Sequence, residues 1–133
     1  SSLKTKWISG GLPETEFLFY LQNSNAILVP YNPEQYQFIQ SGVCTQSIAY
    51  GIPVIVSKGT TSALEAKSYG TSVEFEFGDF NSFLSAIETF STKSKEMLEE
   101  SRRKSVSYKQ SHGAKNYIDL IFKEFVFPSN KQL

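Results

Sequence analysis

Residues 27–56 read ILVPYNPEQYQFIQSGVCTQSIAYGIPVIV and contain two apolar runs, separated by a polar loop and a short helix signal. The first run stops at Pro30, and the second, Val54–Val56, follows Gly51 and Pro53, which end the helix. Strand, loop, glycine-bearing helix start, helix and strand make up the βαβ unit of an open parallel sheet, and such sheets bind ligands at the carboxyl ends of their strands. We therefore expect any functional site of this chain to lie in this segment.

The whole sequence sets broad limits on fold and partners. Its 133 residues suit one domain, and 40% apolar with 14% aromatic residues can supply a core. Thirteen basic and thirteen acidic side chains give a formal net charge of zero, so neither nucleic acid nor anionic lipid is indicated as a partner. The single cysteine, Cys44, excludes an intrachain disulfide and suits a reducing compartment. No apolar run approaches the roughly 20 residues of a membrane span and no signal peptide opens the sequence, so we expect a cytoplasmic domain.

The residues around the first apolar run predict three further elements. A weak strand signal lies at residues 6–8, and Pro13 suits the first position of a helix that Asn23 ends. The strand at 26–30 is apolar on both faces, which is typical of the middle of a covered parallel sheet. Residues 31–40 lack a clean period and carry an Asn-Pro turn signal, so we expect a loop there.

The alternation of helix and strand continues after the loop. Ser41 is the predicted N-cap and Gly51 the C′ residue of a helix over 42–50, and residues 53–56 form the next strand. A second helix of this kind should follow, because the chain continues with another cap signal.

That cap signal is the pair Ser62 and Glu65, whose capping-box spacing predicts a helix closed by Gly70. Residues 73–77 alternate strictly between apolar and charged side chains, so this strand is expected to be half-exposed and near a sheet edge. Asp79 is the predicted cap of a helix with apolar residues at helical spacing.

Helices alone are predicted beyond that point. Residues 93–108 are rich in charge and offer only a thin packing stripe, made of Met97, Leu98, Ser101, Ser105 and Tyr108. A last helix with a strong apolar stripe starts near Ser111, and residues 128–133 form a polar tail. Strands alternating with helices, then helices alone, indicate an α/β fold: a Rossmann-like three-layer αβα domain over residues 1–127, with a small parallel sheet and extra C-terminal helices.

The segments LVPY (28–31), SGVCTQSIA (41–49) and YGIPVIV (50–56) resemble the C-terminal domain of GT-B-type glycosyltransferases of the glycogen-synthase-like retaining group. There the sequence commonly reads strand–PSY, an acidic loop, a glycine-containing helix start and EAMA-x-G-x-PVV. The resemblance covers about residues 6–125. It implies a partial GT-B C-terminal domain, from a longer two-domain chain whose N-terminal domain provides the acceptor site.

The resemblance also implies a donor site. Backbone N–H groups at the helix start hold the diphosphate of a nucleotide sugar in that family, and these positions fall on Ser41, Gly42 and Val43, with Cys44 and Thr45 in the first turn. A glutamate that binds the ribose hydroxyls in the family aligns with Gln46. The family's second glutamate, near the transferred sugar, aligns with Phe38, which cannot replace it, so we assign no catalytic residue.

Each of these residues also has a structural interpretation. Ser41 and Gly42 are equally typical of an ordinary helix start. Tyr31 and Tyr36 either line a sugar or base pocket or only pack. The remaining candidates have a structural interpretation that we prefer: an ordinary loop for residues 58–61, packing for Cys44, and a cap for His112. No cluster of cysteine and histidine has metal-ligand spacing, so no metal site is expected.

The function expected from the resemblance is transfer of a sugar from a UDP- or GDP-linked donor to a glycan, lipid or protein acceptor, without a prosthetic group. The chain alone, without the N-terminal domain, is expected to be inactive. Two alternatives stay open: a non-catalytic module of the same fold, and a nucleotide-sugar epimerase. An open sheet edge at the strand around Trp7 or at 26–30 is further expected to permit a homodimer.

Overall fold

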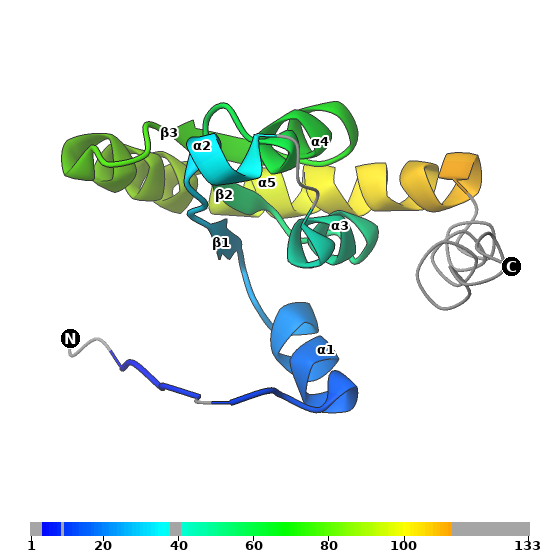
Figure 1. Ribbon diagram of the computed structural model, residues 1–133. Helices are drawn as coiled ribbons and strands as arrows, with labels where there is room; N and C mark the ends of the chain where they lie inside the picture. The colour runs from blue at the N-terminus through cyan, green and yellow to red at the C-terminus, as the bar shows by residue number, and fades with distance from the viewer. Residues whose placement is uncertain (1–3, 9, 38–40, 113–133) are drawn as a thin grey trace, which may run out of the picture.

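A computed structural model describes residues 4–8, 10–37 and 41–112, and the side chains among them up to Gln110. Five helices and three strands alternate along this part of the chain (Figure 1). They are α1 (Glu14–Gln22), β1 (Ile27–Val29), α2 (Pro33–Tyr36), α3 (Gly42–Ala49), β2 (Val54–Ser57), α4 (Thr61–Tyr69), β3 (Ser72–Phe75) and α5 (Phe80–His112).

The three strands form one parallel sheet in the order β1-β2-β3. Leu28, Ile55 and Val73 lie side by side in the register, so they point to the same face. Parallel neighbours need a crossover connection, and α3 and α4 supply the two crossovers. The predicted α/β class with a small parallel sheet is confirmed, and the layering is compatible with a Rossmann-like αβα fold.

Two apolar clusters cover the two faces of the sheet. On one face, Val54 and Val56 pack with Ile48 of α3 and Ala63 and Ala66 of α4. On the other face, residues of the central and last strands pack with the first half of α5: Ile55, Phe75, Phe83, Ala86, Ile87 and Phe90. Alternate residues of β2 therefore point into two helical layers, and all four are buried, as expected for a strand covered on both sides.

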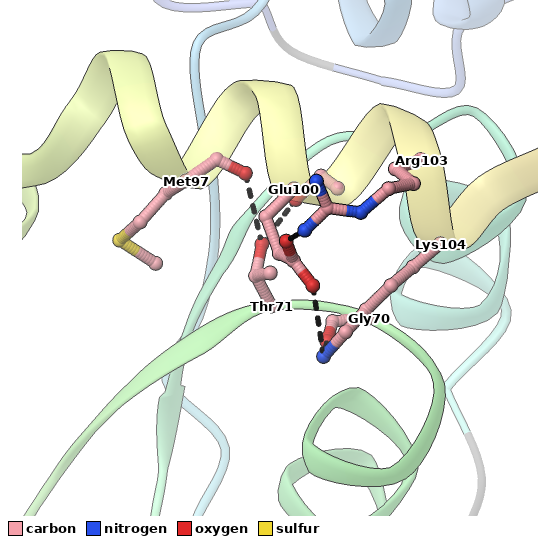
Figure 2. Close-up of polar contacts among 7 residues, drawn as sticks. Gly70, Thr71, Met97, Glu100, Arg103 and Lys104 are labelled. Atoms are coloured by element: carbon pink, nitrogen blue, oxygen red, sulfur yellow. Dashed lines mark hydrogen bonds and ion pairs between the residues drawn. The ribbon is translucent and has the colours of Figure 1, made fainter.

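The long helix α5 leaves the sheet face and reaches the α3–α4 layer by crossing the amino ends of the strands. Lys104 Nζ donates to the Gly70 carbonyl oxygen at 2.9 Å, and the Thr71 hydroxyl bonds to the Met97 carbonyl oxygen at 3.3 Å and to the Ser101 hydroxyl (Figure 2). Farther along α5, Ser105 Oγ donates to the carbonyl oxygen of Ala49 at 2.7 Å. The carboxyl ends of the strands lie on the side of the sheet opposite to this crossing.

Gly51 makes this crossing sterically feasible. Its φ is +73°, a left-handed conformation that glycine adopts without penalty. A Cβ atom at this position would lie 3.1 Å from the Cα of Arg102 and 3.3 Å from the carbonyl oxygen of Ser101. The predicted C′ glycine of α3 is thus also the contact at which α5 passes closest to the α3–β2 connection.

The N-terminal segment corrects two expectations. Residues 4–8 form no strand; the Trp7 side chain is 91% exposed, and Lys6 Nζ instead donates to the hydroxyl of Tyr20 at 2.8 Å. The strand β1 is not in the middle of the sheet, as its two apolar faces suggested, but at its edge, where an open edge was expected as one of two possibilities, and Leu28 is 44% exposed on it. Apolar residues on both faces of a strand therefore did not indicate full coverage here. Helix α1 buries only Leu21 and stands apart from the other elements (Figure 1).

Three boundaries also differ from expectation. The expected loop at 31–40 contains the short helix α2, because Asn32 caps it by accepting from the Glu34 N–H at 3.0 Å and Pro33 occupies its first position. Helix α4 is capped by Thr60 and not by Ser62, since Thr60 Oγ1 accepts from the Ala63 N–H at 3.0 Å. The helix predicted from Asp79 and the charge-rich segment 93–108 form one continuous helix.

The expected edge strand and the cap at Asp79 are confirmed. Strand β3 ends the sheet, and Asp79 Oδ1 accepts from the N–H of Ser82 at 3.0 Å. The thin stripe on the second half of α5 is also seen, since Ser101, Ser105 and Tyr108 are buried. The last predicted helix and the polar tail lie outside the described residues. Within the described part of the chain, no helix is long and apolar enough to cross a membrane.

Candidate functional site

The first turn of α3 begins just beyond the carboxyl end of β1, where the sequence places the site. Ser41 Oγ accepts from the Cys44 N–H at 3.3 Å, and the Thr45 N–H donates to the Ser41 carbonyl oxygen at 3.0 Å, which is the first helical bond. The N–H groups of Gly42 and Val43 precede that bond and have no acceptor within the helix. They are the two donors that this helix start can offer to an anion, together with the positive end of its dipole.

Gly42 leaves these donors uncovered. The residue is exposed, its φ is not in the left-handed range, and a Cβ atom there would meet no atom within 4 Å. Neither backbone conformation nor packing within the described structure therefore requires glycine. Glycine at this position would also allow a ligand to approach the backbone closely.

An aromatic pair lies beside the helix start. The Tyr31 hydroxyl is 3.3 Å from Ser41 Oγ, within hydrogen-bonding distance, and the Tyr31 ring stacks on the Tyr36 ring with centroids 4.3 Å apart and planes 22° apart. Both tyrosines are half-buried. Stacking fixes the Tyr31 ring in one orientation, so its hydroxyl is held next to the cap of α3. The structure thus joins Tyr31 and Ser41, which are ten residues apart in the sequence.

Helix α2, which carries Tyr36, is fixed over the carboxyl ends of the strands. Thr61 Oγ1 donates to the carbonyl oxygen of Gln37 at 2.6 Å and thereby ties the end of α2 to the start of α4. Pro33 lies against Gly59, whose missing Cβ would be 3.5 Å from the proline Cβ. The Asn-Pro dipeptide was interpreted only as a turn, although asparagine before proline is also the N-cap and N1 signal that could have revealed this helix.

Thr60 at the start of α4 and the buried Ser57 at the end of β2 form hydrogen bonds next to the site. Thr60 Oγ1 donates to the Ser57 carbonyl oxygen at 3.0 Å and also caps α4. Ser57 is fully buried, and its hydroxyl donates to the carbonyl oxygen of Tyr31. Ser57 was not singled out from the sequence, because serine at the end of an apolar strand has no distinctive pattern. Its hydrogen bond connects the end of β2 to Tyr31, whose hydroxyl lies beside Ser41.

The other sequence-predicted site residues of α3 differ in how far they are buried. Val43 is half-buried, and so is Gln46 in the second turn. Thr45 is only 3% exposed, and its hydroxyl donates to Glu65 Oε1 of α4 at 2.8 Å. The Thr45 hydroxyl therefore joins α3 to α4, and its N–H bonds to the Ser41 carbonyl oxygen. Ser41, Gly42, Val43 and Tyr31 lie together at the helix start.

Cys44 has the environment of a packing residue. Its side chain is fully buried, its thiol contacts the carbonyl oxygen of Ser62 at 3.5 Å, and it belongs to the core cluster on the α3–α4 face. Burial, and secondarily the charge of Glu65, raises the pKa of Cys44 to about 12. The thiol is therefore neutral near pH 7 and a poor nucleophile, in line with the interpretation preferred from the sequence.

Of the other residues considered from the sequence, only Lys58 can be placed. Phe38 and the side chain of His112 lie outside the described residues. Lys58 forms an exposed ion pair with Glu76, the residue that follows β3, and 3.2 Å separates Lys58 Nζ from Glu76 Oε1. The 58–61 loop therefore contributes the Thr60 cap of α4, whereas the ammonium group of Lys58 is paired with Glu76.

The described residues around the helix start contain no cluster of metal-binding side chains. No group of three or more histidine, cysteine, aspartate or glutamate side chains that could hold a metal ion is found in the described residues. A groove of about 620 Å³ lies instead along the outer edge of β3, and its lining shares no residue with the predicted site. At the helix start, hydroxyl and N–H groups lie beside an aromatic pair.

Comparisons with known proteins add no family assignment. No family model, curated protein or solved structure gives a significant match to this chain.

Proposed function

We propose that these residues form the donor-binding part of a glycosyltransferase that takes a sugar from a UDP- or GDP-linked donor. Ser41, Gly42 and Val43 would hold the diphosphate at the start of α3, Tyr31 would contact the sugar or base, and Gln46 would face the ribose. Acceptors of the glycan, lipid or protein classes would bind to an N-terminal domain of the longer natural chain.

The observation that carries this proposal is the uncovered start of α3 at the carboxyl end of β1. Two N–H donors without a helical acceptor, an exposed glycine and a positioned tyrosine hydroxyl lie together there. Parallel α/β sheets bind ligands at this end of their strands. The family resemblance of residues 28–56 adds the diphosphate as the expected anion.

The expected affinity of the chain alone is low. A helix start contributes roughly 0.3–2 kcal/mol to anion binding, whereas a micromolar complex requires about 8 kcal/mol. Contacts to the base and sugar would have to supply the rest, and those that the proposed N-terminal domain would make are not supplied by these 133 residues. We therefore expect weak nucleotide binding and no transferase activity from these 133 residues.

Titration of ¹⁵N-labelled protein with UDP, GDP and their sugar conjugates tests the proposal. Diphosphates should shift the amide signals of Gly42 and Val43 first, and Gln46→Ala should weaken the nucleoside diphosphates while leaving inorganic pyrophosphate unaffected. Gln110→Ala, an exposed glutamine on α5, is the matched control. Absence of binding by the longer natural chain as well would rule out a donor site.

A non-catalytic module of the same fold is the second candidate, and Gln46 is the observation that favours it. Glutamine keeps hydrogen-bond donors and an acceptor but lacks the carboxylate that the family uses at this position. A glycan product assay on the longer natural chain, with Ser41→Ala and Gln46→Ala variants, separates the two functions. Turnover that falls in both variants supports the transferase, and nucleotide binding without turnover supports the module.

A further inference from the structure

Among the residues that the structure describes, no strand pairs with the outer edge of β3, which lies at the floor of a basic groove. The groove has a volume of about 620 Å³ and is lined by β3 residues together with residues of α4 and α5. Four of its lining residues are lysines and one is a glutamate: Lys58, Lys67, Lys93, Lys104 and Glu74. In a chain whose formal net charge is zero, this is a local excess of positive charge.

The backbone of β3 offers hydrogen-bonding groups to this groove. The Thr71 and Phe75 carbonyl oxygens accept from the N–H groups of Val54 and Lys58, so alternate residues of β3 face β2. In a parallel pairing, the residues between them direct both N–H and C=O to the opposite side. Ser72 and Glu74 therefore point their backbone groups away from the sheet, because β3 is its last strand.

The lysines are distributed around this edge. Lys67 lies on α4 and Lys93 on α5, and both are exposed. Lys104 lies near the amino end of β3, where it bonds to the Gly70 carbonyl oxygen and pairs with Glu100, 3.9 Å away (Figure 2). Lys58 lies near the carboxyl end and pairs with Glu76. Among the described residues, no carboxylate lies within 4 Å of the ammonium groups of Lys67 and Lys93.

We propose that the β3 edge docks an extended acidic peptide segment of a partner protein, which adds to the sheet as a fourth strand. The backbone groups of Ser72 and Glu74 would pair with the peptide backbone, and Lys67 and Lys93 would pair with its carboxylates from the two sides of the strand. Addition of a strand to an open edge is an established mode of peptide recognition, with main-chain bonds giving affinity and side chains giving specificity. Four residues of β3 extend over roughly 13 Å, so the bound core is about four residues long.

Charge decides between an acidic peptide and a second copy of this chain. Pairing of two β3 edges would bring Lys67 and Lys93 of one copy close to the same lysines of the other, and lysines at a strand edge are a known means of preventing such pairing. An acidic segment turns this repulsion into attraction. The interaction is independent of the donor site, since the groove and the start of α3 share no residue.

Fluorescence anisotropy with a labelled eight-residue peptide that alternates valine and glutamate tests this inference. The double variant Lys67→Glu with Lys93→Glu should weaken binding at least tenfold, whereas Lys4→Glu with Lys95→Glu, which reverses two exposed lysines outside the groove, should change it less than twofold. Raising the salt concentration should weaken binding by the unmodified protein.

The strand geometry has its own test. Ser72→Pro removes an outward N–H that no sheet bond uses, and proline is tolerated at such edge positions, so the variant should fold, as judged by circular dichroism, and lose at least tenfold in affinity. In the unmodified protein, peptide binding should protect the amides of Ser72 and Glu74 from hydrogen exchange. No binding, or equal binding of a single-stranded oligonucleotide without protection of these amides, would overturn the proposal.

Discussion

Thr45 Oγ1 donates a hydrogen bond to Glu65 Oε1 at 2.8 Å, and this bond joins α3 to α4 just below the candidate site. Thr45 lies in the first turn of its helix, and Glu65 lies in the second turn of the neighbouring one. Because the bond is largely shielded from water, it fixes the position of one helix start relative to the other. The position of the Ser41–Val43 turn relative to α4 therefore depends on the Thr45–Glu65 hydrogen bond.

Replacement of Thr45 by valine should therefore destabilise the fold. The methyl group preserves the shape of the side chain, but the Glu65 carboxylate loses a donor, and a lost bond to a charged group costs roughly 1.5–3 kcal/mol. Urea unfolding measures the change. Thr89→Val is the matched control, since the Thr89 hydroxyl is exposed and bonds only to the Ser85 carbonyl oxygen of its own helix. Equal decreases in the unfolding free energy of both variants would show that the Thr45–Glu65 bond stabilises the fold no more than an exposed bond within one helix.

Gly51 and Gly78 form a matched pair that isolates the contact between α5 and the α3–β2 connection. Both have a left-handed φ, +73° and +83°, but a Cβ at Gly51 would collide with the α5 backbone, whereas one at Gly78 would meet nothing within 4 Å. Gly78→Ala should cost about 1–2 kcal/mol of unfolding free energy, the price of the backbone conformation alone. Gly51→Ala should cost clearly more, in thermal or urea unfolding, because α5 must also shift. Equal costs would contradict the close packing described here.

Gly42→Ala should separate stability from ligand binding. The new methyl group would have no described atom within 4 Å, so the variant should be more stable by about 0.4–1 kcal/mol, since alanine restricts the unfolded chain. The same methyl group should hinder a diphosphate that approaches the backbone, and we expect about a tenfold loss of affinity for nucleoside diphosphates. Gly11→Ala, also at an uncrowded position with an ordinary φ, is the control. Undiminished binding in a stabilised Gly42→Ala protein would remove the diphosphate from this helix start.

Cys44 makes the stability of the fold depend on alkaline pH. Burial raises the pKa of this thiol from 9.0 to about 12 in the folded chain, so between these values the unfolded chain releases a proton that the folded chain retains. The contribution of the thiol to stability is complete below pH 9 and decreases as the pH rises toward 12. Urea unfolding from pH 8 to pH 10.5 should show a steeper decrease for the unmodified protein than for Cys44→Ala. Parallel decreases would mean that the thiol titrates normally.

Much of the fold was predictable because local signals and burial pointed the same way. The caps at Ser41 and Asp79, the glycines at positions 51 and 70, and the alternation before residue 78 placed most of the elements near their observed boundaries. The strand at residues 6–8 was predicted wrongly because its signal was only local, and no neighbouring strand is there to pair with it. The apolar β1 was predicted as central because a short apolar run does not reveal how many neighbours a strand has.

The site could be predicted only in part. The position of Ser41 at a helix start followed from its local sequence, but its proximity to Tyr31 depends on the short helix α2 and on the Tyr31–Tyr36 stack. The role of Thr45 could not be predicted either, because its partner Glu65 lies twenty residues away on another helix. Contacts between elements are set by packing, and a single sequence carries no direct signal of them.

The outer edge of β1 gives the last prediction, association of two copies of this chain. Ile27 donates its N–H to the Pro53 carbonyl oxygen, so the backbone groups of the next residue, Leu28, point away from the sheet. The Leu28 side chain is 44% exposed, and no strand covers this edge in the described structure. Unlike the β3 edge, this one carries no lysine, and uncharged open edges invite pairing.

Sedimentation equilibrium at increasing protein concentration should therefore detect dimers of the unmodified chain. Leu28→Lys should shift the equilibrium to monomer, because it places a charge at the pairing edge. Leu64→Lys is the control, since Leu64 is 67% exposed on α4 and does not belong to β1, and it should leave association unchanged. A strict monomer at high concentration, or an equal effect of both substitutions, would show that β1 does not mediate association.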